Sequence, residues 1–180
     1  MIDTTASLTF RPADDTDLST LVRLHDGAAR WMQQHGIDQW RPGQKDAAHF
    51  ARRMREGEVW LAELAGRAVG AYELWWEDEG AWGVQPPVAG YVHRLMTDRT
   101  SAPAGLGRAL LAAAESRIAE SGRGLARLDC VSHNPRLRTY YEAAGYRVTG
   151  ENTAKEAPGG APSYAVTLLE KELSGPVSPG

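Results

Sequence analysis

The sequence predicts an α/β fold, with a central mixed, largely antiparallel and twisted sheet of six to seven strands flanked by about four helices. Two observations carry this prediction. The periodic segments follow the order β-α-α-β-β-β-α-β-α-β-β, which mixes hairpins with strand–helix–strand crossovers. The 180 residues show no internal repeat and no linker, so we expect one domain over residues 1–173 and a disordered tail over residues 174–180.

The first half of the chain alternates strand and helix signals. A strand is expected over residues 7–13, followed by an acidic cluster that can cap a helix and by an apolar stripe at helical spacing. A second helix is expected over residues 45–55. The stretch EVWLAELAGRAVGAYELWWEDE then predicts two strands joined by a tight turn at Gly66 and Arg67.

The second half begins with GAWGVQPPVAG, residues 80–90, whose Gly and Pro residues predict a loop. A strand over residues 91–98 leads through a glycine-containing loop to a helix that two further glycines terminate. After another strand, Asn134 and Pro135 open a helix in the preferred way, with Asn at the cap and Pro in the first turn. Two strands complete the expected sheet.

Composition and charge exclude several classes of protein. The net charge of −3, the pI near 6.0 and the scattered arginines argue against a nucleic-acid binder. A single cysteine excludes an internal disulfide and fits a cytoplasmic protein. The first residues, MIDTTASLTF, lack the pattern of a signal peptide, and no apolar run approaches the roughly 20 residues that span a bilayer.

Gly105 and Gly107 stand where the central helix is expected to begin. A helix start carries unpaired backbone N–H groups and partial positive charge, and small residues let an anion approach them. The loop is therefore a candidate phosphate site, although glycines in such places are often only turn residues. It lacks the Gly-Lys-Ser/Thr of a P-loop and the third glycine of a dinucleotide fingerprint.

A second motif, HNPRLRTYYEAAGY, follows the next strand. Together with AGLGRALL at this separation, it resembles the GCN5-related N-acetyltransferase (GNAT) family, which combines a Gln/Arg-x-x-Gly-x-Gly/Ala loop with a helix that carries Asn and ends in aromatic-Tyr-Glu-x-x-Gly-Phe/Tyr. The resemblance covers the chain from Leu8 to about Leu173. It implies the acyl-CoA N-acyltransferase fold, acetyl-CoA as cosubstrate and no metal.

The resemblance also implies a set of cofactor contacts. The pantetheine arm would lie along the strand, against backbone groups, and the pyrophosphate would lie on the amides of the loop. The residues are Leu95, Met96 and Thr97 for the arm, Ala104, Gly105, Leu106, Gly107 and Arg108 for the pyrophosphate, and Asn134 for a further hydrogen bond to the arm. Asn134 is equally a plain helix cap, and the two roles are compatible.

The sequence departs from the family in the loop. The family's Gln/Arg falls at Ala102, and Pro103 removes one possible backbone donor. One side-chain contact to the cofactor is therefore lost, and we ask whether Arg99 or Arg108 replaces it electrostatically.

Tyr141 matches the family's tyrosine before the acidic residue, and the resemblance makes it the catalytic residue. When an amine attacks the thioester, the departing thiolate needs a proton, which a phenol can donate at neutral pH. Leu137 lies four residues earlier, so Tyr141 can alternatively be a core aromatic. Tyr140 is the residue of the pair that we expect to pack.

The general base and the acceptor site are less well defined. Glu73 and His93 are candidates for the base, and a water chain is a third. In the family, the region of Trp31 and Trp40 walls the acceptor pocket. The acidic stretch WEDE either favours a cationic acceptor or is a solvated loop.

The expected function is transfer of the acetyl group of acetyl-CoA to a primary amine by direct attack in a ternary complex. The acceptor is a small molecule or a peptide, with no nucleic-acid or membrane partner, and pairing into a homodimer is common in the family. One alternative is a non-catalytic acyl-CoA-binding or regulatory domain, and another is an unrelated nucleotide-binding enzyme. A thiol nucleophile built from Cys130 and His133 has poor spacing across a strand end.

Overall fold

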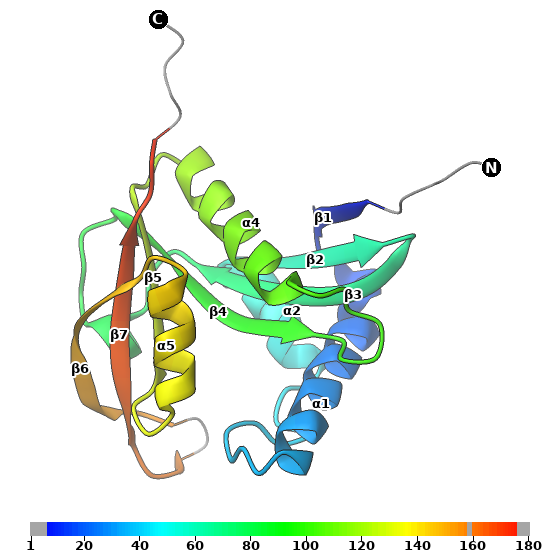
Figure 1. Cartoon of the computed structure of the whole chain (residues 1–180), viewed down its shortest axis with the longest axis horizontal. Helices are drawn as coiled ribbons and strands as arrows, with labels where there is room; N and C mark the ends of the chain where they lie inside the picture. The colour runs from blue at the N-terminus through cyan, green and yellow to red at the C-terminus, as the bar shows by residue number, and fades with distance from the viewer. Residues whose placement is uncertain (1–6, 158–159, 176–180) are drawn as a thin grey trace, which may run out of the picture. The chain divides into compact units, whose positions relative to one another are not determined.

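The computed structural model describes residues 7–157 and 160–175. Its seven strands form one sheet in the order β1-β2-β3-β4-β5-β7-β6 (Figure 1), which confirms the predicted mixed sheet. The chain divides into two compact units: the first comprises Met1–Leu74 and His93–Ala113, and the second comprises Trp75–Val92 and Ala114–Gly180. A single domain over residues 1–173 stays a prediction, and residues 176–180 of the expected tail lie outside the described residues.

The first unit contains the first three strands, two helices and parts of two shared elements. Asp14 caps the short 3-10 helix that runs into the first long helix, and Asp46 accepts a hydrogen bond from the backbone of His49 at the start of the second. Gly36 has a φ of +69° just after the first long helix, as predicted. The elements are β1 (Leu8–Pro12), η1 (Asp15–Asp17), α1 (Leu18–Gln34), α2 (Ala47–Glu56), β2 (Glu58–Leu64), β3 (Arg67–Trp75), and the shared β4 (Ala89–Thr97) and α4 (Leu106–Glu120).

The core of the first unit forms where α1 and α2 pack on one face of its strands. At Gly70 in β3, an added Cβ atom would lie 2.8 Å from the carbonyl oxygen of Met96 in β4, so the close approach of these strands requires glycine. The buried cluster consists of Leu21, Leu24, Phe50, Val59, Leu61, Ala71 and Met96.

The β2–β3 hairpin turns one residue earlier than predicted. Leu64 pairs with Arg67, and the two turn residues are Ala65 and Gly66, with φ values of +51° and +75°. The prediction of Gly66 and Arg67 is therefore wrong by one position. Two-residue hairpins favour turns with positive φ at both central residues, because these match the twist of the strands.

The second unit is built around β5 (Leu125–Val131), β7 (Tyr164–Glu172) and β6 (Arg147–Lys155), with α5 (Pro135–Ala143). β7 is antiparallel to both of its neighbours, whereas β4 and β5 are parallel over a register that extends from Ala89↔Leu125 to Tyr91↔Arg127. The sheet is therefore mixed because of the β4–β5 pair.

A short helix, α3 (Glu79–Trp82), replaces the start of the loop predicted over residues 80–90. The side chain of Asp78 accepts a hydrogen bond from the backbone N–H of Ala81, and both residues are buried. Asn152 of β6 donates hydrogen bonds to the carbonyl oxygens of Gly80 and Ala81. The interpretation of this acidic segment as a solvated loop is therefore wrong at Asp78, because capping and packing hold it inside.

Gly90 in β4 provides the first testable prediction. An added Cβ atom would lie 2.4 Å from Cγ1 of Ile118, a fully buried residue of α4. Gly90→Ala should therefore lower the free energy of unfolding by about 1–3 kcal/mol. Urea denaturation measures this change. Gly150→Ala in β6 is the matched control, because no atom lies within 4 Å of its added Cβ, and a comparable loss there would contradict the packing argument.

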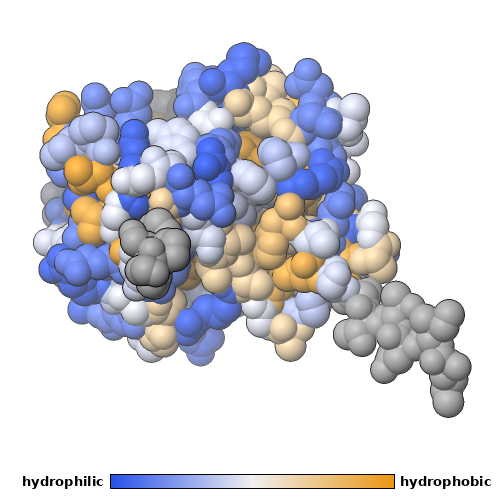
Figure 2. Space-filling model, turned by 90° about the horizontal axis from the view of Figure 1, so that it is seen from above, coloured by the Kyte–Doolittle hydropathy of each residue, from blue (hydrophilic) through white to orange (hydrophobic). Residues whose placement is uncertain are grey.

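Hydrophilic and hydrophobic residues both reach the surface of the described part of the chain. Figure 2 shows hydrophilic and hydrophobic residues interspersed on the face that it displays. Val84 and Val88 are the large hydrophobic side chains that are exposed among the described residues. In the same residues, no helix combines the length and the apolar character needed to cross a bilayer.

Candidate active site

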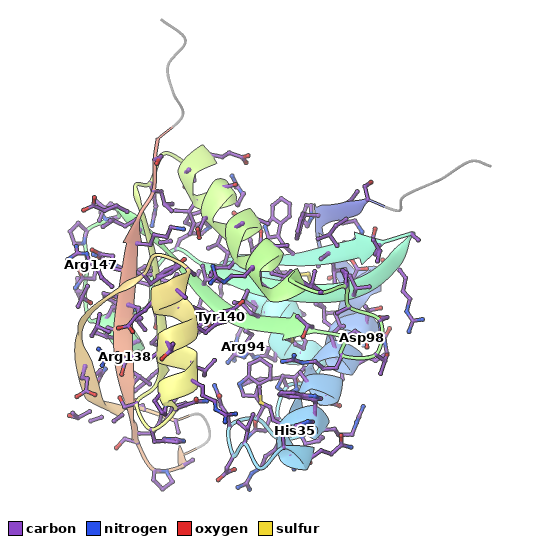
Figure 3. All side chains as sticks on the ribbon, in the orientation of Figure 1. His35, Arg94, Asp98, Arg138, Tyr140 and Arg147 are labelled. Carbon is purple, nitrogen blue, oxygen red and sulfur yellow. The ribbon has the colours of Figure 1, made fainter. Side chains whose placement is uncertain are left out.

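The loop after β4 is held by Asp98, which lies where the strand ends (Figure 3). Its carboxylate accepts hydrogen bonds from the backbone N–H and the hydroxyl of Thr100, at 3.0 and 2.7 Å. Its carbonyl oxygen accepts from the amides of Ser101 and Ala102, at 3.2 and 2.7 Å. Partial burial would raise the pKa of Asp98, but the Thr100 hydrogen bonds outweigh it and lower the pKa to about 2. The loop is therefore an ordered turn.

The glycine motif follows this turn. Gly105 has a φ of +81°, a conformation that L side chains rarely adopt, and its carbonyl oxygen accepts the first bond of α4 from Ala109. The amide of Leu106 donates to the carbonyl of Pro103 at 3.2 Å, and its side chain is buried. Leu106 thus anchors the loop. The other predicted pyrophosphate contacts, Ala104, Gly105, Gly107 and Arg108, are exposed or half-buried.

The predicted pantetheine segment, Leu95, Met96 and Thr97, is the last part of β4. The side chain of Met96 is fully buried in the core of the first unit, while those of Leu95 and Thr97 are half-buried. Arg94, just before them, has a φ of +46°. Such a conformation costs a non-glycine residue about 1–3 kcal/mol and is concentrated at functional sites.

Glu73 does not have the environment of a free general base. It is fully buried, and its two carboxylate oxygens accept hydrogen bonds from His49 Nε2 and Arg94 Nη1, each at 2.9 Å. Burial would raise the pKa of Glu73, but the His49 hydrogen bond and the Arg94 charge outweigh it and lower the pKa to about 2. His93, the other candidate base, is half-buried in β4. Its electrostatic interaction with Glu73 also lowers the pKa of Glu73.

The two tryptophans predicted to wall the acceptor pocket have different surroundings. Trp40 stacks on the buried ring of His25, with ring centroids 5.3 Å apart, and packs against the core cluster. Trp31 lies between two other groups: its ring stacks on His35 at 4.1 Å, and the guanidinium of Arg99 lies 4.0 Å from its centroid. Arg99 is therefore engaged with Trp31.

Trp31 also lines a pocket of about 320 Å³ within the first unit. Arginines from three segments surround this pocket, namely Arg23, Arg30, Arg67 and Arg99. Asp98 provides the one carboxylate among the residues that line this pocket. Its Oδ2 lies 3.3 Å from Nη1 of Arg23.

Tyr141 lies in α5 of the second unit, and Asn134 is the N-cap residue just before this helix. The side-chain oxygen of Asn134 accepts a hydrogen bond from the backbone of Leu137 at 3.3 Å, so its role as a helix cap is established. Its amide nitrogen is a donor and leaves the cofactor role compatible.

Tyr141 is a half-buried residue of α5, and its ring centroid lies 5.3 Å from that of Tyr140. Figure 3 shows Tyr140 on this helix. The ring of Tyr141 also packs edge-on against Tyr146 at 6.1 Å. Burial raises the pKa of Tyr141 above its usual value, so the phenol keeps its proton at neutral pH. Burial also raises the pKa of Cys130 to about 11, which disfavours the thiol-nucleophile alternative.

Of the predicted site residues, the first unit holds the β4 segment, the glycine loop and the candidates for base and acceptor contacts. The second unit holds Asn134 and Tyr141. Sequence reasoning missed Asp98 and His49. The spacing Asp98-x-Thr100 is a signal for an Asx-type turn and could have revealed the first. No local pattern marks His49, because its partner Glu73 is 24 residues away.

The seven-stranded mixed sheet and its helices define an α/β protein with the acyltransferase fold. Residues 28–157 match the family model described as an acetyltransferase (GNAT) domain, and the chain therefore belongs to the GNAT family of acetyltransferases.

Individual relatives support this assignment. The chain is 29% identical over 173 residues to the uncharacterized N-acetyltransferase YesJ of Bacillus subtilis (strain 168), covering 91% of this chain and 89% of that protein. A GNAT-family acetyltransferase from Listeria monocytogenes 4b F2365 is 27% identical, with a TM-score of 0.74 and coverage of 94% and 98%. The putative acetyltransferase yncA of Salmonella typhimurium, solved with acetyl-CoA, shares the fold at 18% identity, with a TM-score of 0.65 and coverage of 97% and 99%.

Proposed function

We propose that this protein transfers the acetyl group of acetyl-CoA to a primary amine, by direct attack in a ternary complex, with Tyr141 as general acid. The observation that carries the proposal is the ordered turn after β4, which leads into the exposed backbone of Ala104 and Gly105 at the start of α4. Such a helix start favours a diphosphate. Membership of the GNAT family supports acetyl-CoA as its source.

The backbone fits the anionic part of this cosubstrate without the family's Gln/Arg. The positive φ of Gly105 turns the chain into α4, and Gly107 keeps side-chain bulk away from the first helical turn. Arg108, exposed in the same turn, adds positive charge. Arg99 is the weaker substitute for the missing side chain, because it is stacked on Trp31.

The remaining contacts follow the strand and α5. The backbone of Leu95 to Thr97 can hydrogen-bond an extended amide chain as an added strand would. The amide nitrogen of Asn134 can donate to a carbonyl of the same chain, while its oxygen caps the helix. A thioester at the end of that chain supplies the activated acetyl group.

The chemistry needs two proton transfers. As the amine nitrogen bonds to the acetyl carbon, the carbon–sulfur bond breaks, and the Tyr141 hydroxyl gives its proton to the sulfur. The amine must lose a proton to a base. Glu73 is unsuited to this role, because both of its oxygens accept hydrogen bonds and its pKa is about 2. His93 and water remain the candidates.

A thermal-shift screen of acetyl-CoA, CoA, ATP and NAD tests the cofactor. A ligand at about 100 times its dissociation constant should add about 2.7 kcal/mol to the free energy of unfolding. We expect acetyl-CoA and CoA to raise Tm, with ATP and NAD as nucleotide controls. The absence of any response to CoA species, or a response to ATP or NAD alone, would overturn the proposal. Release of free thiol with panels of primary amines then reports turnover.

A further inference from the structure

The pocket that Trp31 lines in the first unit is positive, in a chain whose net charge is −3. Its lining comes from α1, from the start of β3 and from the turn after β4, and it includes four arginines and one aspartate. Its volume of about 320 Å³ lies at the lower end of the range of about 300–1,000 Å³ for small-molecule sites. The pocket therefore has the size and the sign of charge to suit a small anion.

One face of α1 forms a wall of this pocket. Its lining residues recur every three or four positions, a spacing that places side chains on the same side of a helix. Leu24 on this face is buried in the core cluster, so the wall is attached to the packed interior of the unit. The lining residues of α1 are Arg23, Leu24, Gly27, Arg30, Trp31 and Gln34.

Gly27 keeps the middle of this wall open. Glycine inside a helix costs about 1 kcal/mol relative to alanine. Tight packing does not require it here: apart from its chain neighbours and the backbone of its own helix, no atom lies within 4 Å of an added Cβ. A side chain at this position would enter the pocket. The glycine thus preserves the space that a ligand would occupy.

Asp98 neutralises only part of the positive charge. Its Oδ2 lies 3.3 Å from Nη1 of Arg23 and 3.8 Å from Nη2 of Arg67. Both distances exceed the roughly 2.7–2.9 Å of a close charge-assisted hydrogen bond. Each guanidinium carries five N–H donors, so a single carboxylate leaves donors of both arginines available.

Arg30 and Arg99 add two further charges. In the part of the chain that the structure describes, neither forms an ion pair, although Asp26, one turn earlier on α1, interacts electrostatically with Arg30. Arg99 is held over the ring of Trp31 at 4.0 Å. A guanidinium that stacks by its face keeps its N–H donors in the plane, where they can bind an anion at the pocket wall. Even with Asp26 counted, four positive charges face two negative ones.

We propose that this pocket binds a small organic anion with at least two negative charges, carried by carboxylate or phosphate groups. Arginine forms paired hydrogen bonds with either group, and two negative charges match the excess of arginines. The site lies beyond the proposed function, because none of its lining residues is among the predicted cofactor contacts. Its test therefore does not depend on acetyl transfer.

Calorimetric titration with citrate, a tricarboxylate, and with glycerol 3-phosphate, a phosphate ester, tests the site. Glycerol is the neutral control, and sodium chloride keeps the ionic strength constant. We expect at least one of the two anions to bind and glycerol not to bind. The anion that binds more tightly shows whether the ligand carries carboxylate or phosphate groups. The absence of binding by both anions at millimolar concentration overturns the proposal.

Variants locate the binding. Arg30→Gln and Arg99→Gln should each weaken it at least about tenfold, the loss expected for a hydrogen bond between charged groups. Arg55→Gln is the matched control, because it removes the same charge from an exposed position of α2 in the same unit. Unchanged affinity in both pocket variants, or an equal loss in Arg55→Gln, would place the anion elsewhere and overturn the proposal.

Gly27→Leu gives a test that unfolding cannot imitate. Leucine is the better helix former, so the Tm without ligand should rise, while the side chain fills the pocket and abolishes anion binding. Retained binding in a folded Gly27→Leu protein contradicts the proposed location. A titration in the presence of CoA separates this pocket from the cofactor site: anion binding should persist, and its loss on CoA binding would assign the anion to the cofactor site instead.

Discussion

Replacement of Tyr141 by Phe should lower kcat by about 100- to 1,000-fold, the usual contribution of a positioned general acid. The substitution removes only the hydroxyl, and the ring contacts with Tyr140 and Tyr146 remain. The free energy of unfolding and the dissociation constant for CoA should therefore change little. The amine-dependent release of thiol measures kcat, and calorimetry with CoA measures binding.

Tyr140→Phe is the matched control, because it removes the same atom from the neighbouring residue of α5. It should keep kcat within about twofold of the wild-type value if Tyr140 only packs. A normal kcat in Tyr141→Phe would exclude Tyr141 as the acid. A large loss in Tyr140→Phe alone would transfer the role to the neighbouring phenol.

Replacement of Glu73 by Gln should lower the free energy of unfolding by about 3–5 kcal/mol, the loss expected when one partner of a buried ion pair is removed. The change leaves the Arg94 side chain, 18% exposed, without its carboxylate, and it weakens the bond to His49. Urea denaturation at neutral pH measures the loss. The exposed pair of Asp38 and Arg41 provides the control, and Asp38→Asn should change stability by less than about 1 kcal/mol.

The Glu73 effect should depend on pH in one direction. The folded pKa of about 2 lies below the ordinary value of 4.5, so the carboxylate contributes its full stability above the unfolded pKa. This contribution decreases as the pH falls from about 4.5 towards about 2. The difference in stability between wild type and Glu73→Gln should therefore narrow over that interval. A difference that stays constant down to pH 2 would mean that the carboxylate charge is not its source.

The elements with strong local signals could be predicted from the sequence. The Asn134–Pro135 start of α5 and the glycine that ends α1 involve only neighbouring residues, and both occur where expected. The helix at Glu79–Trp82 was missed because four residues are too few to show a period. The turn at Ala65 was missed because its positive φ follows from the twist of the paired strands, which residue preferences alone do not reveal.

The residues of the candidate site also fall into a group that the sequence could predict and a group that it could not. The glycine loop and the α5 motif are continuous in sequence and could be recognised there. The surroundings of Glu73 could not, because His49 and Arg94 are 24 and 21 residues away and meet it only through the packing of α2, β3 and β4. Long-range packing therefore determines which carboxylates are available for chemistry.

The first unit is assembled from two separate stretches of chain, Met1–Leu74 and His93–Ala113. During synthesis, α1, α2 and the first three strands leave the ribosome before Met96, the β4 member of its buried cluster, is available. No contiguous fragment that ends before residue 96 can complete that cluster. Truncated clones that stop after β3 should therefore be insoluble, whereas cleavage between Ala113 and the carboxyl terminus leaves every segment of this unit present.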